Sequence, residues 1–386
     1  MFFCLLTSVM QINKNHLRQI PFFKIEQCKS SSFIPCHGFL SFRELPFAPT
    51  SHSNTDLFLR RYAEVVDDML KRGSVNMYMF IGGTNFGFTS GANHYETYAP
   101  DVTSYDYDAL LTECGDVTPK YMAVREVIAR HTGKALLPVP SDRPKAAYGK
   151  VYAATSAGLF DNLDNLSSPI QSQVPECMEY YNAGYGYIVY TSTLNRDYDN
   201  AGLSFAEVGD RAQVYVGNNH VGTVYINNPP YEVTFSAKRG DMLAVVCENM
   251  GRTNFGPKMM RKKGIVGRTL IDGKIHFGWQ AYPLAMDNLD RLQWNEKTHT
   301  YGVFYKFTFD IAEKPCDTFL RTDNFTKGFA VLNGFNLGRF WNVGPQKTLY
   351  VPRSVLRQGG NELIVFDSDG VQGSPMVEFT DKPDLG

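Results

Sequence analysis

Two aspartates, Asp106 and Asp108, stand two residues apart in a loop that begins at Ser104. A pair of carboxyl groups can carry out general acid–base chemistry when one group is protonated and the other is ionised. Aspartate in such loops also commonly hydrogen-bonds its own backbone. We therefore expect both side chains to organise the loop, and we rank Glu96 and Asp101, which precede them, below them as acid–base candidates.

The glycine pair Gly82-Gly83 just before this loop indicates backbone flexibility. The GxGxxG and GxxxxGK phosphate-loop patterns are absent, so no nucleotide cofactor is expected. The seven cysteines lack the CxxC or Cys/His spacing of a zinc site, and no metal is expected. Two sequons, at Asn165 and Asn324, become glycosylation acceptors if the chain enters the secretory pathway.

The loop follows one predicted strand and lies between two predicted helices. An amphipathic pattern over 57–73 predicts the first helix. The continuous apolar run 75–81 predicts a parallel strand buried on both faces. Pro119 opens a second helix over 119–130, because proline fits the first helical turn. This order of elements, helix, strand, long loop and helix, is typical of an α/β barrel.

Beyond residue 175 the helix patterns disappear and short strands follow. The predicted strands cover 186–192, 212–216, 231–235 and 242–247 in a first set, and 301–309, 328–333, 347–351 and 362–366 in a second set. Each set predicts a β-sandwich of jelly-roll type. The segments 214–222 and 330–338 share a strand, an Asn/Gly turn typical of a hairpin, and a following glycine. This similarity suggests a duplicated module, although hairpin chemistry alone can also produce it.

The formal net charge of −1 gives no support for binding to nucleic acid or to an anionic membrane surface. No stretch reaches the length of a membrane span. The apolar start of the chain lacks a basic region and a clear cleavage site, so it makes no convincing signal peptide. The aromatic content of the whole chain, 13%, fits strand-rich cores.

The strand and loop around these aspartates resemble the last strand and rim of the catalytic barrel of family 35 glycoside hydrolases, the lysosomal-type β-galactosidases. The resemblance rests on residues 75–87 and 104–109, and it continues in 248–256 and 333–352. It runs from about His52 to the C-terminus, and residues 1–51 fall outside it.

The resemblance implies an α/β plus all-β chain, in which the C-terminal remnant of a (β/α)8 TIM barrel is followed by two jelly-roll-like β-sandwiches. The expected parts are an unmatched segment 1–51, an incomplete barrel end 52–133, a linker 134–175, a first sandwich 176–272, a connecting loop 273–298 and a second sandwich 299–386. A complete barrel needs about 250 residues. We therefore expect the barrel end to be poorly stable unless it rests on the sandwiches.

Retaining glycosidases use two carboxyl groups about 5 Å apart, one as the acid and one as the nucleophile. In the family that this chain resembles, both are glutamates, one in an Asn-Glu pair and one in a Ser-Glu-Phe-Tyr-like stretch. No Asn-Glu pair precedes Val75 in this chain. Glu44 is the one weak candidate for the nucleophile, and its sequence context is wrong. No catalytic residue is identified, and this chain is predicted to be inactive alone.

Two tyrosines match positions that contact galactose in the family. Tyr78 matches the tyrosine of the last barrel strand, and Tyr107 matches the second tyrosine of the loop that follows. Residues at the C-terminal end of a barrel strand line the active face. The resemblance therefore implies that Tyr78 and Tyr107 bind substrate, while a packed core role is the alternative for Tyr78.

Four residues of the β-rich region also have interpretations. Arg252 and Arg339 are expected to bind backbone carbonyls or carboxylates across domain seams. Trp279 and Trp341 are weaker candidates for sugar binding, and we favour packing for both.

Three functions follow from these patterns. The first is a retaining β-galactosidase that removes terminal β-D-galactose from glycoconjugates, of which this chain is an incomplete copy. The second is a non-catalytic galactoside-binding or interaction protein built on two sandwiches. The third, a new active site formed by Glu44 and a loop aspartate, is the weakest. The first implies β-galactoside glycans as partners and a lysosomal or secreted location, and it leaves homo-oligomerisation and disulfide pairing open.

Overall fold

The computed structural model describes residues 24–27, 37–41, 52–106, 108–295 and 299–386, with side chains described from Leu59 onward. The chain divides into two compact units. Unit 1 contains the described residues up to Thr84 together with Ser104–Pro144, and unit 2 contains Asn85–Thr103 together with Lys145–Gly386. The chain therefore leaves unit 1 at Asn85 and returns to it at Ser104. Two residues singled out by the sequence, Glu44 and Tyr107, lie outside the described residues.

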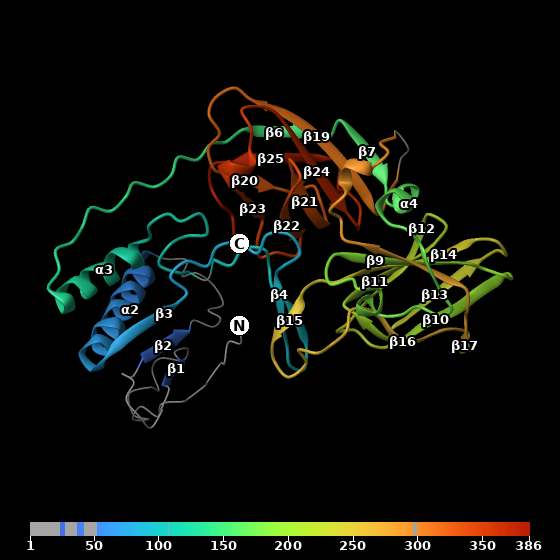
Figure 1. Ribbon diagram of the computed structural model, residues 1–386, viewed down its shortest axis with the longest axis horizontal. Helices are drawn as coiled ribbons and strands as arrows, with labels where there is room; N and C mark the ends of the chain where they lie inside the picture. The colour runs from blue at the N-terminus through green and yellow to red at the C-terminus, as the bar shows by residue number, and fades with distance from the viewer. Residues whose placement is uncertain (1–23, 28–36, 42–51, 107, 296–298) are drawn as a thin grey trace. The chain divides into compact units, whose positions relative to one another are not determined.

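Unit 1 combines a small sheet with two helices (Figure 1). The sheet has the order β1-β2-β3, in which β1 is antiparallel to β2 and β2 is parallel to β3. The elements of the unit are β1 (Lys24–Gln27), β2 (His37–Ser41), α2 (His52–Arg72), β3 (Ser74–Tyr78) and α3 (Pro119–Thr132).

The second helix begins and ends as the sequence predicts. The Thr118 side chain accepts a hydrogen bond from the Tyr121 backbone N–H, and Pro119 occupies the first turn. Gly133 takes the left-handed conformation after the last turn and donates to the Ala129 carbonyl. The α2 and α3 helices pack through a small core that contains Tyr62, Val66, Leu110, Val124 and Val127.

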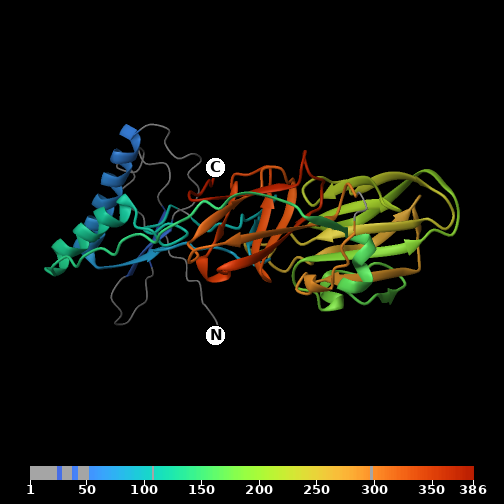
Figure 2. The ribbon, with the colours of Figure 1, turned by 90° about the horizontal axis from the view of Figure 1, so that it is seen from above.

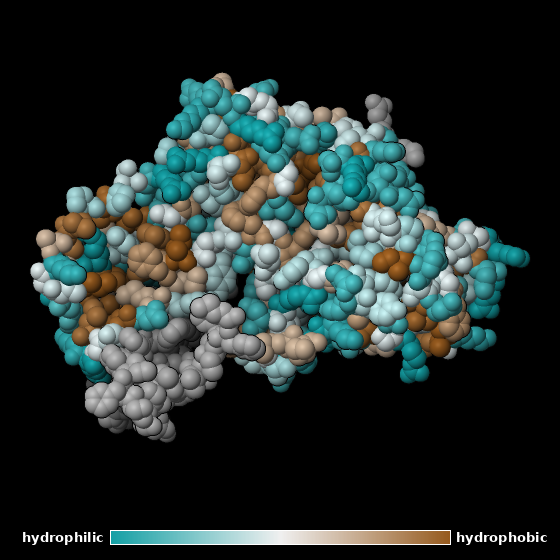
Figure 3. Space-filling view, viewed as in Figure 1, coloured by the Kyte–Doolittle hydropathy of each residue, from teal (hydrophilic) through white to brown (hydrophobic). Residues whose placement is uncertain are grey.

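The prediction that the strand over 75–81 is buried on both faces is wrong. Strand β3 ends at Tyr78, and its side chains alternate between exposed and half-buried. Met77 packs against the core between the helices, whereas Tyr78, Phe80 and Ile81 are exposed. The physical reason is that, among the described residues of unit 1, the helix core meets one face of the strand. Apolar surface is visible around the two helices (Figure 3), and Met122 and Ile128 of α3 are exposed.

Unit 2 contains two β-sandwiches, as predicted from the strand patterns (Figures 1 and 2). The first has one sheet of order β12-β11-β14-β9-β18-β8 and another of order β13-β10-β16-β17. Its strands are β8 (Ile170–Ser172), β9 (Tyr187–Thr193), β10 (Tyr198–Gly209), β11 (Arg211–Val216), β12 (Asn219–Tyr225), β13 (Glu232–Ala237), β14 (Met242–Glu248), β16 (Gly264–Ile271), β17 (Lys274–Ile275) and β18 (Trp279–Leu284).

The second sandwich has one sheet of order β22-β21-β24-β19-β7 and another of order β23-β20-β25-β6. Its strands are β6 (Gly149–Tyr152), β7 (Thr155–Gly158), β19 (Val303–Ile311), β20 (Thr318–Arg321), β21 (Lys327–Leu332), β22 (Phe335–Trp341), β23 (Thr348–Val351), β24 (Gly359–Asp367) and β25 (Met376–Thr380). The structure differs here from the expected linkers, because β6 and β7 lie within 134–175 and β18 lies within 273–298. A short helix, α4 (Leu163–Leu166), also falls in the first of these segments.

The two sandwiches share one strand order. The run β12-β11-β14-β9 recurs as β22-β21-β24-β19, and β13-β10-β16 recurs as β23-β20-β25. Both of the predicted hairpins form, and each carries a register shift at the same place, after Val214 in one and after Ala330 in the other. A turn sequence alone would not reproduce the order of seven strands, so the topology supports the predicted duplication.

Each sandwich encloses its own apolar core. A third core joins the outer faces of the two large sheets, with Val189 and Tyr215 from the first and Phe304 and Phe366 from the second. Because both of their faces are covered, β11 and β21 are buried along their whole length. Phe88, from the segment that leaves unit 1, also belongs to this shared core.

Candidate functional site

The candidate site lies in unit 1, in the loops between β3 and α3. The chain passes Gly82, where an added Cβ would lie 1.5 Å from the Tyr105 carbonyl oxygen, so only glycine fits this approach. Gly83 adopts a left-handed φ of 76°. Thr84 and Ser104 pair as an isolated antiparallel bridge. Thr84 and Ser104 are the residues at which the chain leaves unit 1 and returns to it, on either side of the segment Asn85–Thr103.

A buried glutamate, Glu113, holds this bridge together. Its Oε1 accepts a hydrogen bond from the Thr84 hydroxyl at 2.6 Å, and its Oε2 accepts one from the Ser104 hydroxyl at 2.9 Å. Burial raises the pKa of Glu113 to about 7, the two hydroxyl hydrogen bonds act against this rise, and nearby Asp106 adds to it. Because only 5% of the residue is exposed and both oxygens are occupied, Glu113 positions the loop.

The two loop aspartates play the organising role that the sequence predicts. Asp106 accepts backbone hydrogen bonds from Glu113 at 3.0 Å and from Asp108 at 3.2 Å. Asp108 forms an ion pair with Lys120 at 2.5 Å, and the Lys120 side chain is buried. Burial raises the pKa of Asp106 and lowers the pKa of Lys120. The polar side chains therefore fix the loop on the first turn of α3.

Tyr78 stands at the end of β3 with its side chain half in solvent, at 49% exposure. Its hydroxyl lies 3.3 Å from the Tyr105 hydroxyl. The pair presents phenolic groups that can donate and accept hydrogen bonds. The substrate-binding role of Tyr78 and its alternative, a packed core role in an intact barrel, both stay predictions. Tyr107, its predicted companion in sugar binding, lies outside the described residues, as does the weak nucleophile candidate Glu44.

Glu113 was not among the residues that we singled out from the sequence. One signal was present, because Glu113 follows Leu110-Leu111-Thr112 and precedes Cys114, an apolar setting that favours burial. The hydrogen bond from Thr84 to Glu113 could not be predicted from a local pattern, because the two residues are 29 positions apart in the sequence.

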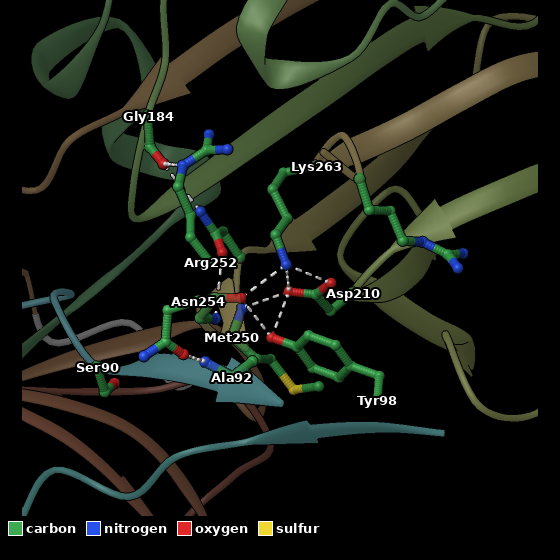
Figure 4. Close-up of polar contacts among 12 residues, drawn as sticks. Ser90, Ala92, Tyr98, Gly184, Asp210, Met250, Arg252, Asn254 and Lys263 are labelled. Atoms are coloured by element: carbon green, nitrogen blue, oxygen red, sulfur yellow. Dashed lines mark hydrogen bonds and ion pairs between the residues drawn. The ribbon is translucent and has the colours of Figure 1, made fainter. Parts of the chain in front are cut away.

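Within unit 2, buried polar contacts hold the segment Asn85–Thr103 against the first sandwich (Figure 4). The Tyr98 hydroxyl lies 2.9 Å from Asp210 Oδ2 and 2.6 Å from the Gly251 carbonyl oxygen. Lys263 Nζ donates to both carboxylate oxygens of Asp210, at 2.6 and 2.7 Å, and to the same carbonyl. All three side chains are buried. The Ala92 backbone N–H donates to Asn254 Oδ1 at 3.1 Å in the same region.

The two arginines bind carbonyls and carboxylates, as expected. Arg339 of the second sandwich donates to the Asn249 carbonyl of the first at 2.9 Å and also contacts Ser90. Arg252 donates to the Gly184 carbonyl at 2.7 Å and to Glu179 at 2.8 Å, within the first sandwich. Arg339 therefore spans a seam between sandwiches, whereas these contacts of Arg252 do not.

The structure also gives the contacts of Trp279 and of the two sequon asparagines, Asn165 and Asn324. Trp279 is fully buried and donates to the His276 carbonyl at 2.9 Å, so it packs in the core. The side-chain amides of Asn165 and Asn324 donate to Asn162 Oδ1 at 3.0 Å and to the Ser374 carbonyl at 2.8 Å. The glycosylation of these two asparagines stays a prediction.

Among the described residues, no group of three or more His, Cys, Asp or Glu side chains could hold a metal ion. In that part of the chain, no helix combines the length and apolar character that a membrane crossing requires.

Three family models match the chain. "Glycosyl hydrolases family 35" matches residues 46–131, "Beta-galactosidase, first all-beta domain" matches 175–285, and "Beta-galactosidase, galactose-binding domain" matches 302–361. The first covers most of the described part of unit 1 together with the segment Asn85–Thr103, and the other two each fall within one sandwich.

Curated relatives are similar over most of the chain. Human "Beta-galactosidase-1-like protein 2" is 37% identical over 328 residues, which is 81% of this chain and 50% of the relative. "Beta-galactosidase" of Xanthomonas manihotis is 40% identical over 79% of this chain and 51% of its own length. "Beta-galactosidase" of Macaca fascicularis is 38% identical over 83% and 52%. The chain therefore spans about half the length of these relatives.

Among solved structures, a β-galacturonidase from Eisenbergiella tayi is 15% identical, with coverage of 60% of this chain and 38% of that one. The TM-score of this match is 0.22.

Proposed function

This chain belongs to glycosyl hydrolase family 35, as the C-terminal portion of a β-galactosidase, and on that basis we propose that the complete enzyme is a retaining β-galactosidase. It removes terminal β-D-galactose from glycoconjugates, and β-galactoside glycans are its partners. The observation that carries the proposal is the Tyr78 hydroxyl, which is exposed at the end of β3 and lies 3.3 Å from that of Tyr105.

In this proposal, unit 1 is the closing end of a (β/α)8 barrel and β3 is its last strand. The helices before and after β3 support this assignment. The active face of such a barrel lies at the C-terminal ends of its strands. Tyr78 and the loop that contains Tyr107 occupy that position in the sequence. The two sandwiches belong to the jelly-roll class.

The proposed chemistry is a two-glutamate mechanism. One carboxylic acid protonates the leaving oxygen, and a carboxylate about 5 Å away attacks the anomeric carbon, so that water releases galactose from a covalent intermediate. This sequence lacks the Asn-Glu and Ser-Glu-Phe-Tyr-like motifs before β3. The role of Tyr78 and Tyr107 is to bind and orient the galactose by hydrogen bonds, which is a positioning function.

A lysosomal or secreted location accompanies this function, and Asn165 and Asn324 are its proposed glycan acceptors. Treatment of the native protein with a peptide N-glycosidase should convert each occupied asparagine to aspartate. Two unmodified asparagines in a protein isolated from lysosomes or medium would contradict the glycosylation proposal.

The assay that tests the proposal uses a chromogenic β-galactoside. The 386-residue chain should show no turnover above background, because it lacks both glutamate motifs. Peptide mapping of the native protein should meanwhile recover peptides with those motifs ahead of His52. Turnover by this chain that is lost in both Tyr78→Phe and Glu44→Gln would overturn the proposed assignment of roles.

A further inference from the structure

A turn in unit 2 places two adjacent methionines in solvent. The turn follows one strand of a small sheet, which consists of β15 (Arg252–Phe255), β4 (Gly91–His94) and β5 (Tyr98–Pro100) (Figure 1). The Arg261 backbone N–H donates to the Lys258 carbonyl at 3.2 Å and closes the turn. Met259 and Met260 therefore lie at its apex, where they are 57% and 94% exposed.

Both ends of this turn are fixed in unit 2. Arg261 Nε lies 2.8 Å from Glu207 Oε1, and the buried ion pair of Lys263 follows two residues later. At the other end, a Cβ added to Gly256 would lie 2.4 Å from the His94 carbonyl oxygen, so only glycine fits this approach. The apex therefore projects from an ordered base, and a surface that binds it has few residues left to order.

An aromatic ring extends the apolar surface of the turn. Phe255, the last residue of β15, is 42% exposed. The Tyr95 ring orients it from the turn after β4, with 5.8 Å between the ring centroids and 65° between the planes. Because β4 is parallel to β15, the turns that follow them leave the sheet at the same end. Single exposed apolar residues are common on protein surfaces, whereas a cluster such as Phe255, Met259 and Met260 indicates a contact site.

The turn also concentrates positive charge. The stretch 249–271 contains no acidic residue, and its basic residues are Arg252, Lys258, Arg261, Lys262, Lys263 and Arg268. Lys258 and Lys262 flank the apex and are exposed, and in the described part of the chain no ion pair involves either of them. Glu96, in the turn after β4, is an exposed carboxylate nearby. The formal net charge of −1 averages over the whole chain and hides this local excess.

We propose that this turn binds the surface of an anionic lipid bilayer. Met259 and Met260 enter the boundary of the acyl chains, Phe255 lies at the level of the headgroups, and Lys258 and Lys262 contact acidic headgroups. A protein partner fits less well, because a stable protein interface buries about 800 Å² on each side and is depleted in lysine. A soluble polyanion would offer no apolar phase to the methionines. This inference does not depend on the proposed hydrolysis.

The experiment is co-sedimentation of the full chain with vesicles of phosphatidylcholine, alone or with about one third phosphatidylserine. We expect saturable binding to the anionic vesicles, which high salt weakens by screening the lysines. Met259→Ser with Met260→Ser should weaken this binding about tenfold or more, because less apolar surface leaves water. Lys258→Gln with Lys262→Gln should weaken it about 25-fold, since each lysine near an anionic surface contributes a factor of about five.

Matched variants locate the contact. Lys314→Gln with Lys382→Gln removes two exposed charges elsewhere in unit 2, and Val343→Ser replaces an exposed apolar residue. Both changes should leave vesicle binding unchanged, and every variant should unfold at the temperature of the unchanged chain. The additional fluorescence of Met260→Trp should be quenched by brominated lipid, whereas that of Val343→Trp should not.

Absence of binding to the anionic vesicles would overturn the proposal. Binding that the distant lysine pair weakens as much as the Lys258 and Lys262 pair would also overturn it, because the attraction would then belong to the whole chain. A chain that binds no vesicles, but self-associates in sedimentation velocity until Met259→Ser and Met260→Ser are introduced, would assign the turn to a contact between two copies instead.

Discussion

Glu113 is the residue on which the candidate site depends most directly. Its carboxyl group joins the Thr84 and Ser104 hydroxyls, and these two residues mark the ends of the segment that enters unit 2. A carboxyl group with a raised pKa binds its proton more tightly in the folded state than in the unfolded state. Its contribution to stability is therefore fully present below its ordinary pKa and is lost as pH rises through about 7.

We predict that Glu113→Gln removes this pH dependence. The wild-type loop should be less protected from amide hydrogen exchange at pH 8 than at pH 5, after correction for intrinsic rates. The difference should correspond to about 3 kcal/mol, since one unit of pKa is about 1.4 kcal/mol. The informative amide is Leu111, whose N–H donates to the Phe80 carbonyl. Glu126→Gln, on the exposed side of α3, is the control, and an unchanged pH dependence in Glu113→Gln would contradict this account.

At the scale of elements, the buried contacts of Tyr98, Asp210 and Lys263 decide where the segment Asn85–Thr103 lies in unit 2 (Figure 4). A buried ion pair is costly to break, because the remaining charge cannot recover its hydration. In this cluster the carboxylate also accepts from the Met250 backbone N–H at 3.0 Å. This satisfied network is therefore one of the contacts that hold the segment, beside the Phe88 core contact and the Arg339–Ser90 contact.

We predict that Lys263→Ala lowers the stability of unit 2 by about 3–5 kcal/mol, the range for removing one partner of a buried pair. Urea denaturation followed by the fluorescence of the tryptophans measures this change. Lys262→Ala, at the exposed neighbouring position, should change stability little. The double variant Asp210→Asn with Lys263→Met should recover part of the loss. Equal stability of Lys263→Ala and Lys262→Ala would contradict the role of the network.

The elements found from the sequence are those with strong local patterns. The helix that opens at Pro119 and strands such as β14 could be predicted because proline and continuous Val-rich runs leave few alternatives. Strand β10 was missed, because its sequence Tyr-Asp-Asn-Ala-Gly-Leu reads as a turn. It forms because β13 and β16 supply its hydrogen-bond partners from distant sequence. The same limit applies to the hydrogen bond between Thr84 and Glu113, which are 29 residues apart and meet only through tertiary packing.

At the scale of the whole molecule, the two units differ in how they bury apolar surface. Unit 2 has three large cores, and its strands are covered on both sides at the centre. The described residues of unit 1 form one small core, and Leu137, Ile128 and Phe80 are among its exposed apolar residues. Local opening is easier where few apolar contacts hold the chain. Unit 1 should therefore open before unit 2.

We predict that limited proteolysis cuts unit 1 first, between Gly133 and Pro144, where the chain is largely exposed. Mass spectrometry should then find a resistant fragment that begins near Lys145 and keeps Asn85–Thr103 bound until denaturation. Survival of the region 52–133 in the intact chain, while unit 2 is degraded, would contradict this order of stability.

The most direct test of the account is to restore the barrel. The portion of a full-length relative that precedes the equivalent of His52 is joined to residues 52–386 of this chain, and hydrolysis of a chromogenic β-galactoside is measured. We expect turnover with retention of anomeric configuration, a lower kcat/KM in Tyr78→Phe, and no such loss in the Tyr95→Phe control. A folded fusion protein that hydrolyses no β-galactoside, or one whose activity is the same in Tyr78→Phe, would contradict the central claim.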